Sequence, residues 1–495
     1  MSAPIKHVFV LMLENRSFDH LLGYLPHVNG VTKDMSNPNP SANGPHPVLA
    51  NPGATDRAEA DPKHEFKDVW TQLYGKPPVA NFTGGSAALP TMDGFVASGG
   101  PEAMACFKLS AVPVLALLAQ SFLVLDCWHA SMPGPTWPNR FFVHAGSSGG
   151  LTNSPSPLAS LEGVTIADLS FGFSNGTIYD RLDDQRLPWR VFHGDAMPQV
   201  LAVKRHVMPF IACSKNFASI TPSDPNDPFA TQLNARTYDA AYTFIEPDYN
   251  IATNMYFGNS QHPRGSVSKG EMLIKYVYET LRNSRVWEES LLLITYDEHG
   301  GFFDHVVPQR CPAPGDVPLN YDRAEKPCPF DFRRYGVRVP AVLVSPFVDA
   351  GVNSGLFDHT SILKTLTEIF PSIGSLTKRD EAASSLLPLL ERPKARLTDA
   401  EAPMKLIASS PPPVTAAPLT LDPNDPPDAT LAGFTRIAAS LDIGMSHLQL
   451  PRPTALVLED IRLPVQSVRT AQESLDYIQQ VLKRLRTYQT STAMH

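Results

Sequence analysis

Four short runs of the sequence are apolar on both faces and end in polar or glycine-rich residues, which is typical of strands buried in a parallel sheet. These runs span residues 7–13, 121–125, 291–296 and 339–344. Stretches with helical spacing accompany them at 112–119, 269–283 and 360–369. Because strands alternate with helices along the chain, we predict an α/β fold with a mostly parallel sheet that is flanked by helices on both faces.

The character of the sequence changes after about residue 370, and this change predicts how the chain is organised. We expect a main domain at 1–370, a variable proline-rich connection at 371–428 and a helical C-terminal extension at 429–495. Residues 409–428 are rich in proline and should form an extended spacer. All but two of the 15 histidines lie at or before His359, so we expect the chemistry upstream of the extension.

Charge and hydropathy exclude several classes of protein. The 495 residues carry 41 lysines and arginines against 49 aspartates and glutamates, a net charge of −8, which argues against a nucleic-acid binder. The longest uncharged run, 111–125, is shorter than the ~20 residues that a membrane span needs. No signal peptide is recognisable at the N-terminus. We therefore expect a soluble protein, cytoplasmic as the sequence stands or the mature form of a secreted one.

Polar side chains follow three of the four predicted strands at the point where each strand ends. Glu14 and Asn15 follow the first strand, Asp126 the second, and Asp297 and Glu298 the third. Ligands of α/β sheets bind at the carboxyl ends of strands, and carboxylate and amide oxygens are ligands of hard divalent cations. Two adjacent carboxylates repel each other unless a cation or a proton lies between them. These residues predict a cation site, with a capped helix start after the first strand and a solvated turn after the third as the alternatives.

A proline-rich stretch at 131–138 precedes another predicted helix. Thr136 is followed by Trp137 and Pro138 and then by an apolar segment, as at a helix N-terminus. The N–H groups and the positive dipole end of such a helix attract phosphate. The Thr136 hydroxyl is therefore either an ordinary helix cap or a nucleophile that a metal activates.

Two histidines and one serine motif are weaker candidates. His64 and His262 lie in polar loops, where a histidine is either a surface residue or part of a site. Residues 146–150 read Gly-Ser-Ser-Gly-Gly and match the G-x-S-x-G nucleophile elbow, which needs a strand before it and a helix after it. The sequence predicts a helix before this segment and a proline-containing loop after it, so we treat the match as chance.

Taken together, these motifs resemble the bacterial phosphoesterase family, which contains non-specific phospholipases C, their plant relatives and certain acid phosphatases. The resemblance rests on five segments: 14–20 (Glu-Asn-Arg-Ser-Phe-Asp-His), 133–140 (Pro-Gly-Pro-Thr-Trp-Pro-Asn-Arg), 246–249 (Glu-Pro-Asp-Tyr), 296–305 (Tyr-Asp-Glu-His-Gly-Gly-Phe-Phe-Asp-His) and 358–361 (Asp-His-Thr-Ser). It implies an alkaline-phosphatase-like fold and makes 1–370 a phosphoesterase catalytic domain.

The resemblance also implies roles for individual residues. One divalent metal ion, whether calcium, magnesium or zinc, would be held by Glu14, Asn15, Asp297 and Glu298. Thr136 would be the nucleophile, and His64 and His262 would lie around the phosphate, with His193 or His206 in a further role.

The activity expected from the resemblance is metal-dependent hydrolysis of phosphate esters, chiefly phospholipase C type cleavage of phospholipids through a phosphothreonine intermediate. The alternatives are an acid phosphatase that acts on phosphomonoesters and a non-catalytic lipid-binding module. A sulfatase is disfavoured, because sulfatases need a modified cysteine or serine where this chain has Thr136. The expected partners are a phosphate-ester or phospholipid substrate and, at most, peripheral contact with a membrane.

Overall fold

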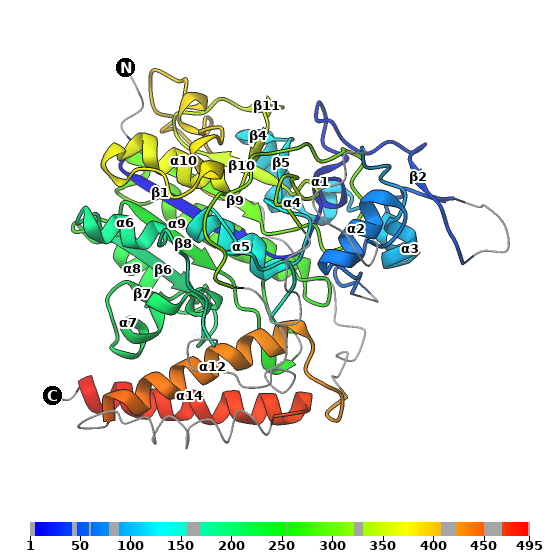
Figure 1. Ribbon diagram of the computed structural model, residues 1–495. Coiled ribbons are helices and arrows are strands. Elements are labelled where there is room, and N and C mark those ends of the chain that lie inside the picture. The colour runs from blue at the N-terminus through cyan, green and yellow to red at the C-terminus, as the bar shows by residue number, and fades with distance from the viewer. Residues whose placement is uncertain are drawn as a thin grey trace.

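The computed structural model describes residues 5–41, 47–58, 61–78, 89–155, 169–253, 255–320, 330–406, 422–449 and 468–493. Within these residues an eight-stranded sheet has the strand order β11-β4-β10-β9-β1-β8-β6-β7 (Figure 1). Its strands are β1 (His7–Leu13), β4 (Leu123–Leu125), β6 (Trp189–His193), β7 (Phe217–Ser219), β8 (Tyr242–Glu246), β9 (Ser290–Tyr296), β10 (Ala341–Val344) and β11 (Gly351–Asn353). Two small pairs are formed by β2 (Ser36–Asn37) with β3 (Val48–Leu49) and by β5 (Trp128–His129) with β12 (Phe357–Asp358).

The centre of the sheet consists of buried parallel strands. β1 lies between β8 and β9 and runs parallel to both. Every residue of β1 and β9 is buried, which explains why both of their faces are apolar in the sequence. The register pairs Leu13 with Tyr296, so β1 and β9 end side by side at the same edge of the sheet.

One strand runs against its neighbours, and for this strand the sequence-based prediction is wrong. Residues 339–344 are predicted to be a parallel strand, but β10 is antiparallel to both β9 and β4. The chain leaves β9 at its carboxyl end and enters β10 from that same edge. Burial makes both faces of β10 apolar whichever way the strand runs, so hydropathy carries no information about its direction.

Helices cover both faces of the sheet, as predicted (Figure 1). On one face α9 (Val267–Arg282) packs against α4 (Pro113–Ser121) and α8 (Pro228–Asn234). On the other face α5 (Thr136–Ala145) packs against α6 (Ile178–Asp184) and α10 (Thr360–Ile369). Further α-helices are α1 (Phe18–Leu22), α2 (Phe66–Tyr74), α3 (Phe95–Gly99), α7 (Val207–Ile211) and α11 (Lys378–Glu381).

The C-terminal extension is helical, as predicted. Helices α12 (Ala429–Gln449) and α14 (Ala471–Ala493) lie side by side at the bottom of Figure 1. They pack on α7 and bury a second apolar cluster that includes Leu441 and Leu485. No helix among the described residues is long and apolar enough to cross a membrane.

The connection between the sheet and the extension is described only in part. Leu386 and Leu390 pack into the apolar core of the sheet, so the beginning of the connection belongs to the main body. Residues 407–421, which include most of the predicted spacer, lie outside the described residues. The division of the chain at residues 370 and 428 stays a prediction.

Buried neutral histidines should make the stability of this fold depend on pH. Burial lowers the pKa of His144 to about 3, and its Nδ1 lies 3.2 Å from the Tyr179 hydroxyl. In the unfolded chain this pKa returns to about 6.5, so unfolding takes up a proton at any pH between these two values. The stability that neutral His144 contributes is therefore present above pH ~6.5 and is lost as the pH falls toward ~3.

We expect the wild-type protein to lose about 2 kcal/mol more of its free energy of unfolding than His144→Gln does when the pH falls from about 7.5 to about 5. Urea unfolding at both pH values measures the two losses. Equal losses in the two proteins would contradict a buried imidazole that stays neutral in the native state.

Candidate active site

The edge at which β1 and β9 end brings together the four predicted metal ligands. The Asn15 N–H donates to Asp297 Oδ1 at 3.2 Å, and the Asn15 side-chain amide donates to Glu298 Oε1. Glu14, directly before Asn15, is buried as well. The N–H of Glu298 donates to Asp297 Oδ1 and the N–H of Gly300 to Glu298 Oε2, both at 2.7 Å. Glu14, Asn15, Asp297 and Glu298 therefore form one cluster, which we call the carboxylate cluster.

A close approach between two loops builds the carboxylate cluster. Gly300 has a φ of +65°, and a Cβ at this position would lie 2.2 Å from the Asn15 carbonyl oxygen. Only glycine fits there, because any side chain would push the two loops apart. Asn15 itself has a φ of +56°, a left-handed conformation that asparagine tolerates better than most residues.

Helix α5 carries the predicted nucleophile to the same cluster. Thr136 Oγ1 lies 3.3 Å from Asn15 Nδ2. Arg140, one turn further along α5, donates from Nε to Asp297 Oδ2 at 2.9 Å. Residues four apart share one face of a helix, which explains why both side chains reach the cluster.

Thr136 does not cap α5, so the interpretation of its hydroxyl as a helix cap is wrong. Pro135 occupies the N-cap position, Thr136 is the first helical residue, and no side chain makes a capping hydrogen bond there. Asn139 orders the preceding loop instead, because its Nδ2 donates to the carbonyl oxygens of Gly134 and Pro135. The Thr136 hydroxyl is thereby left to face Asn15.

A cavity of about 320 Å³ opens beside Thr136 and contains both predicted histidines. His64, His262 and Asp61 line this catalytic cavity together with Thr136. His64 Nε2 lies 3.3 Å from Asn15 Nδ2, at the border of the carboxylate cluster. The carboxylate of Asp61 lies between the two imidazoles, 4.0 Å from His64 Nδ1 and 3.8 Å from His262 Nε2. Two loops that are distant in the chain therefore place acid–base groups around the threonine hydroxyl.

The carboxylate cluster carries more negative charge than its neighbours compensate. Burial and the charge of Asp297 raise the pKa of Glu14 to about 8. Burial raises the pKa of Asp297 to about 6, although Arg140 opposes the shift. Glu14 Oε2 is buried and has no hydrogen-bond partner among the described residues. A hard divalent cation fits this donor set, because it would bind the free oxygen and neutralise the crowded carboxylates.

The two histidines of the catalytic cavity differ in protonation. Burial by itself lowers the pKa of His64, but the charges of Glu298 and Asp61 outweigh burial and raise this pKa to about 9. Burial lowers the pKa of His262 to about 3, against the opposing charge of Asp61. The two imidazoles are therefore shifted in opposite directions, and acid–base catalysis uses both the charged and the neutral form of histidine.

Three side chains at this site have no role in the sequence-based prediction: Arg140, Asp61 and His359. His359 Nε2 lies 2.6 Å from the carbonyl oxygen of Asp297, so it holds the loop that carries two cluster residues. The spacing of four between Thr136 and Arg140 is a signal that sequence reasoning could have used. No comparable signal links His359 to Asp297, because only the fold brings them together.

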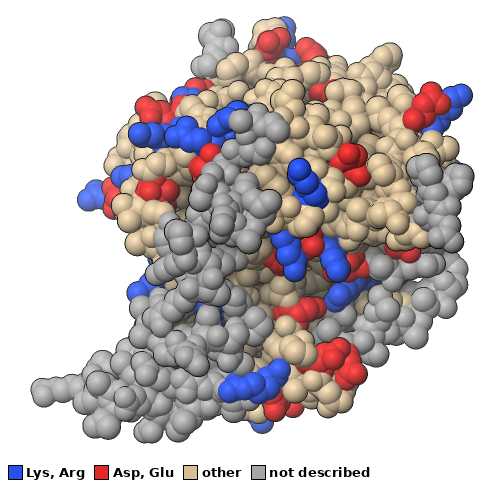
Figure 2. Space-filling model, turned by 45° about the vertical axis from the view of Figure 1, so that its right-hand side comes forward, with Lys and Arg blue, Asp and Glu red and all other residues tan. Residues whose placement is uncertain are grey.

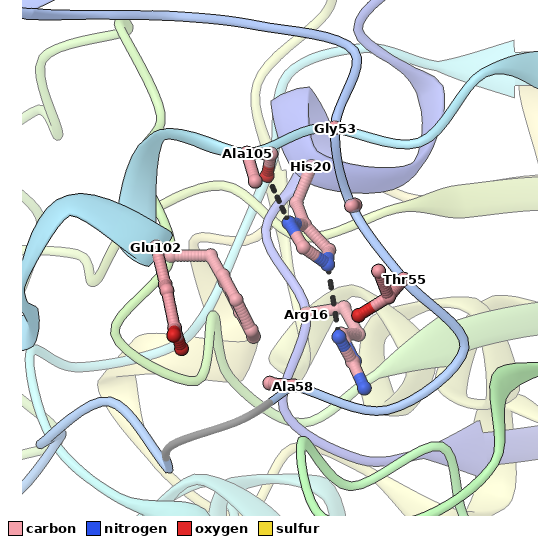
Figure 3. Close-up of a pocket in the computed structure, with 9 residues that line it drawn as sticks. Arg16, His20, Gly53, Thr55, Ala58, Glu102 and Ala105 are labelled. Carbon is pink, nitrogen blue, oxygen red and sulfur yellow. Dashed lines mark hydrogen bonds between the residues drawn. The ribbon is translucent and has the colours of Figure 1, made fainter. Parts of the chain in front are cut away.

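Arg16 and His20 of the 14–20 segment face a different cavity, of about 200 Å³ (Figure 3). There Arg16 Nη1 lies 2.9 Å from His20 Nε2, and His20 Nδ1 lies 2.7 Å from the carbonyl oxygen of Ala105. Arg16 also donates from Nη2 to the carbonyl oxygen of His262 at 3.2 Å. These motif residues therefore support the loop of His262 from behind.

The remaining candidates do not reach Thr136. Neither His193 nor His206 lines the catalytic cavity. Gly146 ends helix α5 in a left-handed conformation, so the serine motif at 146–150 follows a helix and is not a nucleophile elbow. The chance interpretation of that match agrees with the structure.

The sequence model of the Phosphoesterase family matches residues 5–371, which include the carboxylate cluster, Thr136 and both cavity histidines. The chain belongs to the Phosphoesterase family. The predicted resemblance is therefore confirmed.

Curated relatives of this phosphoesterase come from plants and bacteria. It is 34% identical over 407 residues to non-specific phospholipase C6 of Arabidopsis thaliana, covering 77% of this chain and 71% of that protein. It is 26% identical over 398 residues to non-hemolytic phospholipase C of Pseudomonas aeruginosa, covering 74% of this chain and 54% of that protein. A solved structure of an alkaline phosphatase superfamily protein from Vibrio parahaemolyticus is similar at 13% identity and a TM-score of 0.31, covering 57% of this chain and 65% of that one.

Removal of one cluster carboxylate should weaken the binding of divalent cations to this phosphoesterase. Asp297→Asn takes away an anionic oxygen and leaves Arg140 without its ion-pair partner. We expect the dissociation constant to rise at least about 100-fold, the upper end of what loss of an outer-shell partner costs. Calorimetric titration of chelator-treated protein with calcium, magnesium and zinc measures the change.

Asp126→Asn is the matched control for this experiment. Asp126 follows β4 at the same edge of the sheet, but its Oδ2 accepts a hydrogen bond from the N–H of Asn29, away from the cluster. Equal affinities in Asp297→Asn and the wild-type protein would show that the cluster does not hold the cation.

Proposed function

We propose that this protein is a phosphoric ester hydrolase of the phospholipase C type in which Thr136 is the nucleophile. The observation that carries the proposal is the contact of Thr136 Oγ1 with Asn15 Nδ2, within a buried carboxylate cluster that opens into a cavity. The Thr136 hydroxyl caps no helix, so it is available for another role. A hydroxyl nucleophile needs groups around it that stabilise its charged form, and the amide of Asn15 lies beside this hydroxyl. The relatives named phospholipase C support a phosphate-ester substrate.

The proposed reaction is a double displacement at phosphorus. The Thr136 hydroxyl gives up its proton and its oxygen attacks phosphorus, so that an Oγ–P bond forms while the P–O bond to the leaving alcohol breaks. Water then attacks the phosphothreonine, the Oγ–P bond breaks, and the threonine hydroxyl is restored. The guanidinium of Arg140 and the amide of Asn15 favour the negative charge that develops beside the cluster.

The two histidines of the cavity have different roles in the proposed reaction. His64 carries a positive charge at neutral pH and binds the phosphate oxygens. His262 is neutral, so it can accept the proton of Thr136 and pass it to the leaving oxygen. The carboxylate of Asp61 compensates the charge that either imidazole gains.

A divalent cation bound by Glu14, Asn15, Asp297 and Glu298 would supply charge neutralisation and a lowered pKa of the Thr136 hydroxyl. Three carboxylates and one amide favour a hard ion such as calcium or magnesium, whereas zinc prefers nitrogen and sulfur ligands. Elemental analysis of protein purified without chelators, followed by chelation and restoration of single ions, identifies the metal.

Three substrates separate the candidate activities. A phospholipase C should hydrolyse p-nitrophenylphosphorylcholine and phosphatidylcholine micelles. An acid phosphatase should prefer p-nitrophenyl phosphate, and a lipid-binding module should bind micelles and hydrolyse none of the three. We expect the first pattern, and the last pattern would overturn the proposal.

Loss of the nucleophile should nearly abolish turnover. We expect Thr136→Ala to lower kcat by about 10⁴ or more, because no neighbouring group can take the place of the hydroxyl. Thr136→Ser is the conservative control and should retain most of the activity. Mass spectrometry of acid-quenched wild-type reactions should show a phosphorylated peptide that contains Thr136. Near-normal activity of Thr136→Ala would contradict the covalent step.

The role of His262 as proton donor depends on the leaving group. p-Nitrophenolate departs without a proton, whereas the alkoxide of a lipid glycerol needs one. Both substrates lose the acceptor of the Thr136 proton in His262→Ala, and phosphatidylcholine also loses the proton donor to its leaving oxygen. We therefore expect kcat/KM to fall at least about tenfold more for phosphatidylcholine than for p-nitrophenylphosphorylcholine. His27→Ala, at an exposed histidine outside the cavity, is the control. Equal losses on the two substrates would mean that another group protonates the leaving oxygen.

A further inference from the structure

The C-terminal extension reaches the catalytic cavity. Asp428 and the first two residues of α12, Ala429 and Thr430, line the same cavity as Thr136 and His262. Figure 2 shows charged side chains of both signs around a hollow between the main body and its lower part, where the C-terminal helices lie. The extension therefore contributes a wall to the cavity, although its sequence indicates only a packing role.

Asp428 joins this wall to the catalytic loops through two contacts. Its Oδ1 accepts a hydrogen bond from the N–H of Leu431 at 2.9 Å, so it caps the start of α12. Its Oδ2 forms an ion pair with Arg264 Nη1 at 3.1 Å. Arg264 Nε lies 3.4 Å from Asp61 Oδ2, and the same oxygen lies 3.8 Å from His262 Nε2. Charges of alternating sign thus run from α12 to the histidine that we assign to proton transfer.

The packing of α12 fixes the position of this wall relative to the nucleophile. The ring of Phe434 lies 5.7 Å from that of Trp137, the residue next to Thr136, and 5.6 Å from that of Tyr249. Gly433 lies directly against Trp137, because a Cβ at this position would come within 2.1 Å of the indole. The start of α12 is therefore held in place by the helix that carries Thr136.

We propose that the start of α12 is a specificity-determining wall that receives the alcohol group retained on the phosphate, the head group of a phosphodiester. This inference rests on the proposed function. The wall and the floor beside it present the carboxylates of Asp428 and Asp68 and the hydroxyl of Thr430, with Arg264 paired to Asp428 and Lys63 elsewhere in the lining. A polar head group with positive charge or hydrogen-bond donors fits these acceptors, whereas acyl chains do not. The head group accordingly enters the cavity, and the diacylglycerol stays at its mouth.

Asp428→Asn changes the charge of the wall and preserves its structure. Asparagine caps a helix as well as aspartate does, so α12 should keep its start. The cavity gains one unit of positive charge, because Arg264 loses one of its two carboxylate partners. p-Nitrophenylphosphorylcholine and p-nitrophenyl phosphate release the same leaving group, and the phosphates of both are negative. A rise in KM that is confined to the first ester therefore reports on its choline group.

We expect Asp428→Asn to raise KM for p-nitrophenylphosphorylcholine about five- to tenfold, because the added charge repels the choline cation. KM for the dianion p-nitrophenyl phosphate should stay the same or fall, and kcat for both should change less than about twofold. Thr430→Phe makes the cavity narrower at the wall without changing its charge. It should raise the ratio of the KM for p-nitrophenylphosphorylcholine to the KM for p-nitrophenyl phosphate. Asp425→Asn is the matched control, since Asp425 is an exposed carboxylate of the same segment outside the cavity.

The outcomes distinguish this inference from the proposed function. Wild-type protein that hydrolyses neither ester overturns the proposed function itself. Wild-type protein that hydrolyses both, with equal KM changes for the two esters in Asp428→Asn or with no change, overturns the wall and leaves the function standing. Hydrolysis of the monoester alone also overturns the wall, because no head group is then retained.

Discussion

Three carboxylates are buried at the ends of two adjacent parallel strands, and the guanidinium of Arg140 and the imidazole of His64 offset only part of their charge. Glu14 follows β1, and Asp297 and Glu298 follow β9, while Arg140 pairs with Asp297 and His64 lies 3.8 Å from Glu298. Burial makes this concentration of charge expensive unless the carboxylates are protonated or a cation binds. Burial accordingly raises the pKa values of Glu14 and Asp297. One oxygen of Glu14 is also buried without a hydrogen-bond partner among the described residues. The rest of the site is arranged around this imbalance.

A second acidic pair at the same edge of the sheet is compensated by charge within the protein. Asp19 and Asp304 are both buried and both bind Arg338, at 3.1 Å and 2.8 Å. Arg338 also donates from Nη1 to the carbonyl oxygen of Asn29 at 2.8 Å, so that this guanidinium is fully used within the protein. The carboxylate cluster lacks such saturation, and this difference is why we propose the cluster, and not the Asp19–Asp304 pair, as the cation site.

Helix α5 couples the cluster to the C-terminal extension. The guanidinium of Arg140 lies 5.4 Å from the ring centre of Tyr249, and Tyr249 in turn contacts Phe434 of α12. Trp137 contacts Phe434 from the same helix. One element thus carries the proposed nucleophile, the counter-charge of Asp297 and the residue Trp137 on which α12 packs. The proposed head-group wall and the carboxylate cluster are consequently linked through packing, and not only through the cavity.

The sequence by itself determined the parts of this protein that depend on local pattern. Buried strands such as β1 and β9 are continuous apolar runs, and Thr360–Ile369 is helical as its spacing predicts. Both follow from the order of apolar and polar residues within a short segment. Glu14, Asn15, Asp297 and Glu298 could be singled out as candidates because they follow apolar runs that predict parallel strands, and the carboxyl ends of such strands bind ligands. Only the tertiary structure decided the direction of β10, the placement of the Thr136 hydroxyl beside Asn15 and the contacts of Asp61, His359 and Asp428. These depend on which loops meet in space, and contacts between residues far apart in the chain leave no periodic signal in the sequence.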